Sequence, residues 1–286
     1  MMRFGLIVHL GKDIAISTAN DLVKTLPGRG VQVFLDPETA DYLDLPEASF
    51  GDQDLAGKLD VVVVLGGDGA LLNAARRLAG TSLPILGVNV GHLGFLTEVE
   101  LKGMGNALDR ILSGRYEVEE RMMVHAEVRR GGKGVVGEFI GLNDVVVTKG
   151  AFARMIRLDT YVGSSLIGTY PADGAIVASP TGSTGYSLSA GGPIVNPVMN
   201  MLILTFICPH TLGARSFVVS PEDDVRIVLE AQNEDVMLTI DGQVGFALEH
   251  RDEVVVKPAV PKTYLIKLGN RDFYEVLKTR LAEGKV

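Results

Sequence analysis

The sequence is poor in cysteine, in long apolar runs and in positive charge, and each shortage excludes a class of protein. Cys208 is the single cysteine in 286 residues, which excludes an internal disulfide framework and favours a reducing compartment, the cytoplasm. The net charge of −8 argues against a protein that binds nucleic acid or an anionic membrane. Any phosphate-bearing ligand must then be held locally, by backbone N–H groups and a few cations.

Apolar runs are too short to cross a bilayer. The longest, residues 61–65 and 201–208, fall well short of the ~18–20 residues that a membrane span needs. Their length is typical of buried strands, and Cys208 is expected to lie in the core. The first ten residues lack a small-residue cleavage site, so they predict a strand and not a signal peptide.

Two site types have no supporting pattern. No cluster of His, Cys and Asp shows the spacing of metal ligands, so no metal held by the protein itself is expected. The GxGxxG dinucleotide fingerprint is absent from the glycine-rich turn after residues 61–65, which disfavours an ordinary nicotinamide dehydrogenase.

Strand-like and helix-like patterns alternate over the first third of the chain. Buried strands separated by helices predict a parallel α/β sheet, whereas residues 36–54 are expected to form a loop with one helical turn. The expected strands are 4–10, 31–35, 61–65 and 84–90, and the expected helices are 13–26, 70–80 and 105–114.

After residue 116 the pattern becomes β-rich. Short strand candidates follow one another without a long intervening helix, and the tail at 272–281 regains helical spacing and is expected to pack on the first domain. We therefore expect one domain from residues 1–116 plus 270–286 and a second from 117–269. The strand candidates in the second are 122–129, 138–140, 144–148, 157–161, 175–179, 203–207, 225–229, 236–240 and 253–257.

The turn Gly66-Gly67-Asp68-Gly69 joins a strand to a helix, where α/β sheets bind ligands. Glycines allow close approach of a polyphosphate, and the helix N-terminus supplies N–H donors. An aspartate would repel phosphate, so Asp68 suggests a base that orients an attacking hydroxyl. The alternative is that Asp68 merely caps the helix.

The second domain carries two further polar stretches. Asn143 and Asp144 open a strand and could bind ribose hydroxyls or a base edge, although such pairs are also common in turns. Residues 170–193 combine hydroxylic residues with glycines and could hold a heterocycle and a sugar. A flexible surface loop is the alternative for that stretch.

Together these residues resemble the NAD kinase family, which uses ATP or polyphosphate. The PTGSTGY…SAGGP stretch is the specific part of the resemblance, since lipid kinases and phosphofructokinases share the GGDG turn. The matching segments are 66–69, 91–96, 143–144, 173–174, 180–186, 189–193 and 209–212 with Arg215.

The resemblance implies a Rossmann-like α/β N-terminal domain and a β-sandwich-like, NAD-binding C-terminal domain. It implies transfer of a phosphoryl group to the 2′-hydroxyl of the adenosine ribose of NAD, with Mg²⁺ carried by the donor, and a homodimer or homotetramer in which a neighbour completes the site. Asp68 is implied as the catalytic base, and Gly66, Gly67 and Gly69 as donor-binding residues. The implied NAD-binding residues are Asp68, Gly69, Phe95, Asn143, Asp144, Arg154, Asp173, Thr184, Gly185, Tyr186, Ser189 and Gln243.

Two other functions stay open at this point. A lipid kinase of the diacylglycerol kinase type would use the same GGDG turn but would not need the hydroxyl-rich stretch, and a non-catalytic dinucleotide sensor would not need Asp68.

Ala70 stands where the family usually has Thr or Ser, and Pro171 where many members have Arg. The choice of ATP or polyphosphate, and of NAD or NADH, is therefore not determined.

Overall fold

The computed structural model describes residues 1–51, 55–91, 94–150, 154–230, 235–269 and 272–282. The chain forms two compact units. Within the described residues, unit 1 comprises residues 1–120 and 262–282, and unit 2 comprises residues 121–261. Strands β6 and β17 contribute residues to both units. The division expected at 116 and 270 stays a prediction about domains.

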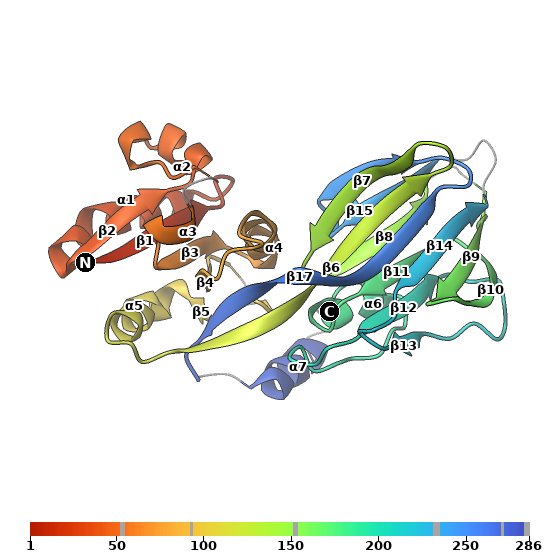
Figure 1. Ribbon diagram of the computed structural model, residues 1–286. Coiled ribbons are helices and arrows are strands. Elements are labelled where there is room, and N and C mark those ends of the chain that lie inside the picture. Colours follow the sequence, from red (N-terminus) through yellow and green to blue (C-terminus); the bar gives the residue numbers. More distant parts are fainter. Residues whose placement is uncertain (52–54, 92–93, 151–153, 231–234, 270–271, 283–286) are drawn as a thin grey trace. The chain divides into compact units, whose positions relative to one another are not determined.

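Unit 1 alternates strands with helices, as Figure 1 shows. Four parallel strands lie in the order β2-β1-β3-β4, and the C-terminal part of β17 pairs with β4. Its strands are β1 (Met2–Val8), β2 (Val31–Leu35), β3 (Val61–Gly66), β4 (Pro84–Asn89) and β5 (Val99–Glu100). Its helices are α1 (Asp13–Thr25), η1 (Pro27–Arg29), α2 (Pro37–Tyr42), η2 (Pro46–Ala48), α3 (Leu55–Lys58), α4 (Asp68–Arg77), η4 (Leu101–Gly103), α5 (Met104–Leu112) and α7 (Phe273–Ala282).

The central strand β3 shows why this sheet forms. All six of its residues are buried, as expected for a parallel strand covered on both faces. Helix α4 presents Leu71, Leu72, Ala74 and Ala75 to the interior, which is the apolar face of an amphipathic helix. The parallel α/β fold expected for this part of the chain is confirmed.

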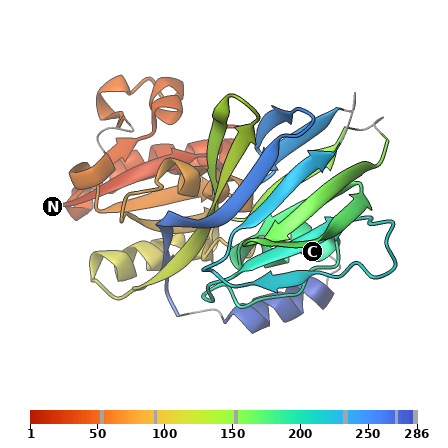
Figure 2. The same ribbon diagram turned by 45° about the vertical axis from the view of Figure 1, so that its right-hand side comes forward.

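Unit 2 consists of two largely antiparallel sheets, seen from a second direction in Figure 2. One has the order β13-β12-β11-β8-β15-β16, and the other contains β10-β9-β14-β17 with the β6–β7 hairpin. The strands are β6 (Glu117–Arg130), β7 (Gly134–Gly141), β8 (Asp144–Lys149), β9 (Ile156–Val162), β10 (Ser165–Ala172), β11 (Gly174–Ala178), β12 (Leu202–Ile207), β13 (Phe217–Val219), β14 (Val225–Glu230), β15 (Val236–Ile240), β16 (Val244–Leu248) and β17 (Glu253–Lys267). Two short helices, η5 (Thr181–Thr184) and α6 (Tyr186–Ser189), follow β11.

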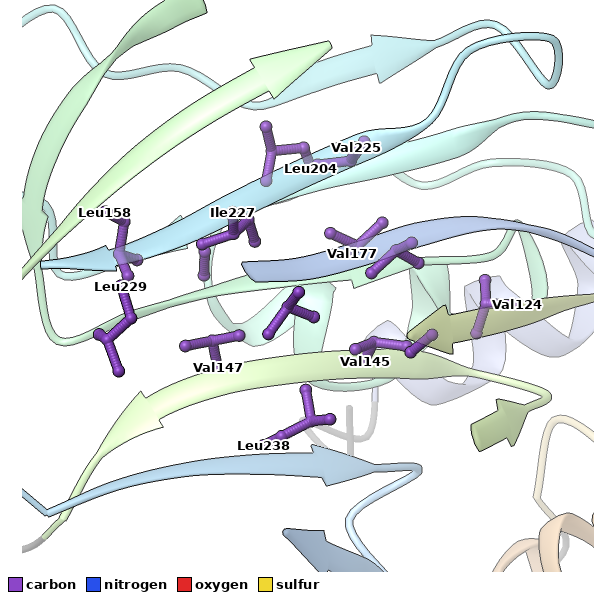
Figure 3. Close-up of a cluster of buried hydrophobic side chains, with 14 of the residues drawn as sticks. Val124, Val145, Val147, Leu158, Val177, Leu204, Val225, Ile227, Leu229 and Leu238 are labelled. Carbon is purple, nitrogen blue, oxygen red and sulfur yellow. The ribbon is translucent and has the colours of Figure 1, made fainter. Parts of the chain in front are cut away.

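An apolar core lies between the two sheets of unit 2. Figure 3 shows Val145, Val147 and Val177 from one sheet pointing toward Leu158 and Ile227 from the other. Alternating inward-facing residues on both sheets produce this arrangement. The expected β-sandwich-like domain is therefore confirmed.

Four local expectations were wrong. Residues 36–54 contain helix α2, which has 6 residues and is longer than the single helical turn that was expected. Strands β10, β13 and β16 were missed, because edge strands with exposed residues show little apolar alternation. Helix α4 begins at Asp68 and not near Ala70. Cys208 is exposed, with a φ of 46°, just beyond the buried strand β12.

Among the described residues, no helix is long and apolar enough to cross a membrane.

Candidate active site

The glycine turn lies at the carboxyl edge of the parallel sheet in unit 1. Strand β3 ends at Gly66, which pairs with Asn89 at the end of β4. Gly67 then takes an extended conformation (φ −116°, ψ −167°) and occupies the N-cap position of α4. A Cβ on Gly66 would lie 2.4 Å from the Ala70 Cβ, whereas no described atom lies within 4 Å of one on Gly67. The two glycines therefore meet different needs, close packing at Gly66 and open space at Gly67.

Asp68 is the first residue of α4, and its side chain turns toward a second loop. Its Oδ2 accepts the backbone N–H of Phe95 at 2.8 Å, and its Oδ1 accepts those of Leu96 at 3.2 Å and Thr97 at 3.3 Å. Because Gly67 holds the N-cap position, the alternative of Asp68 as a simple N-cap is wrong. A carboxylate oxygen has two lone-pair sites, so Oδ2 can accept a hydroxyl in addition to Phe95.

The loop that holds Asp68 is itself fixed by side chains. Asn89 donates through Nδ2 to Thr97 Oγ1 at 3.2 Å and accepts the N–H of Gly91 at 2.6 Å. Thr97 Oγ1 also accepts the N–H of Gly94 at 3.2 Å. A Cβ on Gly94 would lie 2.0–2.2 Å from the carboxylate of Asp68, so only glycine fits there. His92 and Leu93, which belong to the matching segment 91–96, lie outside the described residues.

A cavity of about 500 Å³ opens beside this turn within unit 1. It lies at the carboxyl ends of β1 and β2 and along α4, the edge where α/β sheets bind ligands. Its lining includes residues of the β1–α1 connection and four polar residues from other elements. The lining residues are Ile7, Val8, His9, Leu10, Gly11, Asp36, Pro37, Glu38, Ala70, Asn73 and Arg77.

A buried acid and a cation face each other in this cavity. Arg77 Nη1 lies 3.5 Å from Asp36 Oδ2, and Thr39 Oγ1 donates to Asp36 Oδ1. Burial raises the pKa of Asp36, and the Thr39 hydrogen bond and the Arg77 charge oppose that rise. The cavity thus offers a charged pair that can contact hydroxyls and phosphate oxygens.

In unit 2, Asn143 and Asp144 lie at the start of β8 in a turn fixed from two sides. Asp241 accepts their N–H groups through Oδ1, at 2.7 Å from Asn143 and 3.2 Å from Asp144. On the other side, Ser179 donates its N–H to the carbonyl of Asn143 at 2.8 Å and its Oγ to the carbonyl of Leu142 at 2.6 Å. The backbone at these positions therefore has its hydrogen bonds provided by the protein.

The side chains of Asn143 and Asp144, in contrast, lie beside Gly185. A Cβ on Gly185 would lie 3.4 Å from Asn143 Nδ2 and 3.8 Å from Asp144 Oδ2. Asn143 Oδ1 is buried and accepts no hydrogen bond from the described residues, a state that costs about 1–3 kcal/mol when no partner is supplied. Burial, and then the charge of Asp241, raise the pKa of Asp144 to about 7. A polar ligand would relieve both groups.

The hydroxyl-rich stretch divides into structural and accessible residues. Ser179, Thr181, Ser183 and Ser187 are buried and their hydroxyls bond within the protein; Ser183, for example, donates to the carbonyl of Val195 at 3.1 Å. The interpretation of the whole stretch as ligand donors was therefore too broad, and so was the alternative of a flexible loop. The more accessible members are Thr184, Gly185, Tyr186 and Ser189.

The remaining predicted NAD-binding residues do not all lie near Asn143. Gln243 lies in the turn after β15, where its N–H donates to the carbonyl of Ile240 at 2.9 Å. Asp173 lies at the opposite end of β8, 3.6 Å from Lys149 Nζ, and Arg154 is exposed just before β9. The register places Asp144 beside Ala178, and Asp173 lies five residues before Ala178, so Asp144 and Asp173 are separated by about 16 Å at about 3.3 Å per residue.

Within the described residues, no three His, Cys, Asp or Glu side chains form a group that could hold a metal ion. The acidic groups near the glycine turn already have partners, since Asp68 accepts three N–H groups and Asp36 pairs with Arg77. These residues fit a divalent cation that arrives on the phosphates of a donor better than one held by the protein alone.

Several residues of the site were missed at the sequence level. Asn89 and Thr97 support the loop that holds Asp68, and Asp241 supports Asn143 from 98 positions away. Gly94 was included only within the matching segment 91–96. Only Asp241-Gly242 carried a local signal, a turn directly after a strand. Nothing in the local pattern connects that turn to Asn143.

Both units match known protein families. Residues 4–116 match the ATP-NAD kinase N-terminal domain, and residues 142–268 match the ATP-NAD kinase C-terminal domain. The chain belongs to the NAD kinase family. Since the matched ranges include both the glycine turn and the Asn143 turn, family membership covers both sites, and the family activity is phosphorylation of NAD.

Individual relatives cover the whole chain. An NAD kinase of Moorella thermoacetica is 46% identical over 284 residues, covering 99% of this chain and 90% of the relative. An NAD kinase of Geotalea daltonii is 44% identical over 285 residues, covering both chains in full. These family relatives are phosphotransferases, which excludes the lipid kinase and the non-catalytic sensor as the family of this chain.

Two solved structures share the fold. Yeast NADH kinase complexed with NADH superposes with a TM-score of 0.90 at 24% identity, covering 100% of this chain and 89% of that one. An NAD kinase from Archaeoglobus fulgidus in complex with ATP gives a TM-score of 0.75 at 24% identity, covering 98% and 99% of the two chains. Both similarities concern the fold.

Proposed function

We propose that this chain transfers the terminal phosphoryl group of ATP or polyphosphate to the 2′-hydroxyl of the adenosine ribose of NAD, with Asp68 as the base. The observation that supports this most directly is the placement of Asp68 at the carboxyl edge of β3 and β4, held by Phe95, Leu96 and Thr97. An acceptor-orienting carboxylate is a recurring part of phosphoryl-transfer sites.

The proposed phosphoryl transfer forms one phosphorus–oxygen bond and breaks another. The 2′-hydroxyl loses its proton to Asp68 while its oxygen forms a bond to the terminal phosphorus of the donor. The bond between that phosphorus and its bridging oxygen breaks, and the electron pair leaves with the shortened donor. Asp68 later releases the proton to solvent. Little covalent chemistry falls to the protein, so the chain acts mainly by orienting the two substrates.

We place the donor at the glycine turn and in the neighbouring cavity of about 500 Å³. The N-terminus of α4 offers N–H groups to phosphate, the open space at Gly67 allows close approach, and Arg77 lies on the cavity wall. Mg²⁺ enters with the donor, neutralising phosphate charge that the acidic protein would otherwise repel.

NAD is proposed to contact Asn143, Asp144 and Gly185, together with Gly69, Phe95, Thr184, Tyr186, Ser189 and Gln243. Asp173 and Arg154 lie at the other end of β8 from Asp144. We propose that they act on the NAD of a neighbouring subunit, in a homodimer or homotetramer with closed symmetry. The chain then functions in the cytoplasm as an oligomer.

The direct test is incubation of the purified protein with NAD, MgCl₂ and ATP, followed by detection of product with a dehydrogenase specific for NADP. A parallel reaction with inorganic polyphosphate identifies the donor. The proposal expects NADP with at least one donor. Absence of NADP with both donors, from protein that is folded and binds NAD, would overturn it.

A further inference from the structure

Asp241 is a buried aspartate that lies outside the set of residues proposed to touch NAD. It directly follows β15 and is 8% exposed. Its Oδ2 accepts the N–H of Leu142 at 3.1 Å, in addition to the two bonds that Oδ1 accepts from the next two residues. One carboxylate thus binds three consecutive N–H groups of another segment.

We propose that Asp241 is a positioning residue for NAD binding, which fixes the turn that presents the side chains of Asn143 and Asp144. This inference rests on the proposed function, in which those two side chains contact NAD. A further hydrogen bond runs in the opposite direction, because the N–H of Asp241 donates to the carbonyl of Asp144 at 3.0 Å. The two turns therefore hold each other in one register.

The backbone conformation at position 241 would suit glycine better than aspartate. Asp241 has a φ of 51°, in the left-handed region, which glycine adopts without steric cost and which disfavours most other residues. An aspartate at this position therefore accepts a steric cost in its backbone, and its side chain gains three hydrogen bonds from N–H groups. It also brings a negative charge beside Asp144, which is itself only 4% exposed.

The two buried acids lie side by side at an electrostatic cost. The charge of Asp241 contributes to the raised pKa of Asp144, whereas its three hydrogen bonds hold the turn. Perturbed acids of this kind gather at functional sites. The protonated carboxyl of Asp144 can donate a hydrogen bond to a ribose oxygen, which an ionised carboxylate cannot do.

The side chains of Asn143 and Asp144 lie beside the same glycine. Asn143 Nδ2 and Asp144 Oδ2 lie within 4 Å of the position that a Cβ of Gly185 would take, and Asn143 Oδ1 is buried without a described partner. A rotation of the 142–144 turn would move both groups away from that glycine together. Asp241 is the group that prevents such a rotation from the side of β15.

The test compares two variants at position 241 with a matched control. Asp241→Asn keeps the shape but places an amide donor against one of the three N–H groups. Asp241→Gly removes all three bonds and suits the positive φ, so it protects the backbone if the first variant does not fold. The control is Asp252→Asn, a second buried aspartate of unit 2, which binds Arg130 and accepts the N–H of Glu249 at 2.8 Å.

We expect both Asp241 variants to bind NAD at least about tenfold more weakly by calorimetry, raising the KM for NAD much more than they lower kcat. Asp252→Asn should lower the melting temperature and leave NAD affinity unchanged. In Asp241→Asn, the pH dependence of NAD affinity should also move to lower pH. Among the described groups on β11, β15 and the 181–185 segment, Asp241 is the one whose charge acts on Asp144.

Two results overturn the inference and can be told apart by a pair of further variants, Asn143→Ala and Asp144→Ala. If these weaken NAD binding while both Asp241 variants bind as the wild type does, Asp241 does not position the turn. If Asn143→Ala and Asp144→Ala themselves bind NAD normally, the proposed NAD contacts are wrong, and the role of Asp241 falls with them.

Discussion

Asp144 and Asp241 hold each other through reciprocal hydrogen bonds. The N–H of Asp144 donates to Asp241 Oδ1 at 3.2 Å, and the N–H of Asp241 donates to the carbonyl of Asp144 at 3.0 Å. The arrangement places two acids together in a buried turn, and burial followed by the charge of Asp241 raises the pKa of Asp144 from 3.8 to about 7. The turn is therefore well bonded but electrostatically unfavourable at high pH.

That pKa predicts how folding stability depends on pH. Between pH values of about 4 and 7, folded Asp144 keeps a proton that the unfolded chain releases, so the free energy of unfolding falls as pH rises through this interval. At about 1.4 kcal/mol per pKa unit, the full loss is on the order of 4 kcal/mol. Asp144→Asn should remove this dependence and be more stable than the wild type at pH values above about 7. Urea unfolding across that range measures it, and parallel curves for the two proteins would contradict it.

The role of Asp68 predicts a loss of turnover without a loss of fold. Asp68→Asn keeps the shape of the side chain but cannot accept the ribose proton, and loss of a general base typically costs about 10²–10⁴-fold in rate. The control is Asp60→Asn in the same unit, which loses an ion pair with Arg3 and should retain turnover. Near-wild-type kcat in Asp68→Asn would remove Asp68 from the mechanism.

The two adjacent glycines of the turn predict opposite phenotypes. Gly66→Ala places a Cβ 2.4 Å from the Ala70 Cβ, so it should lower the melting temperature. A Cβ at Gly67 has no described atom within 4 Å and the φ of −116° is ordinary, so Gly67→Val should fold normally. Because its side chain would occupy the donor approach, Gly67→Val should abolish transfer and largely spare NAD affinity. A Gly67→Val enzyme with normal turnover would place the donor elsewhere.

The position of Asp173 predicts complementation between subunits. Asp68→Asn and Asp173→Asn should each be inactive alone. Co-expressed with two different tags and purified as a mixed oligomer, they should recover roughly a quarter to a half of wild-type activity, since one intact site forms per mixed pair. If the mixed oligomer is as inactive as either parent, Asp173 serves the site of its own chain.

Dependence on a divalent cation separates donor binding from NAD binding. Because the cation is proposed to arrive on the donor phosphates, EDTA should abolish NADP formation, and MgCl₂ or MnCl₂ should restore it. NAD affinity, measured by calorimetry without donor, should be unchanged by EDTA. Full activity after chelation, with metal-free reagents confirmed by elemental analysis, would exclude this role for the cation.

The parallel sheet, the β-rich second domain and the turns at 66–69 and 143–144 could be predicted from the sequence. Residues 61–65 are β-branched or aliphatic and are followed by Gly66 and Gly67, a pattern that favours a strand buried on both faces and then a tight turn. Strand β2 was predicted with the bounds that the structure shows, Val31–Leu35. The start of α4 was placed two residues late, because Asp68 interacts favourably with the positive end of the helix and extends it to the turn.

Only the tertiary structure decided which distant residues complete each turn. Asp68 is bound by N–H groups 27 to 29 positions away, and Asn143 by a carboxylate 98 positions away. It likewise separated Asp173 from Asp144 and exposed Cys208 just beyond a buried strand. Local spacing sets the hydrogen bonds and apolar faces within an element, and these follow fixed periods. Contacts between elements depend on the register and packing of whole sheets, for which no local period exists.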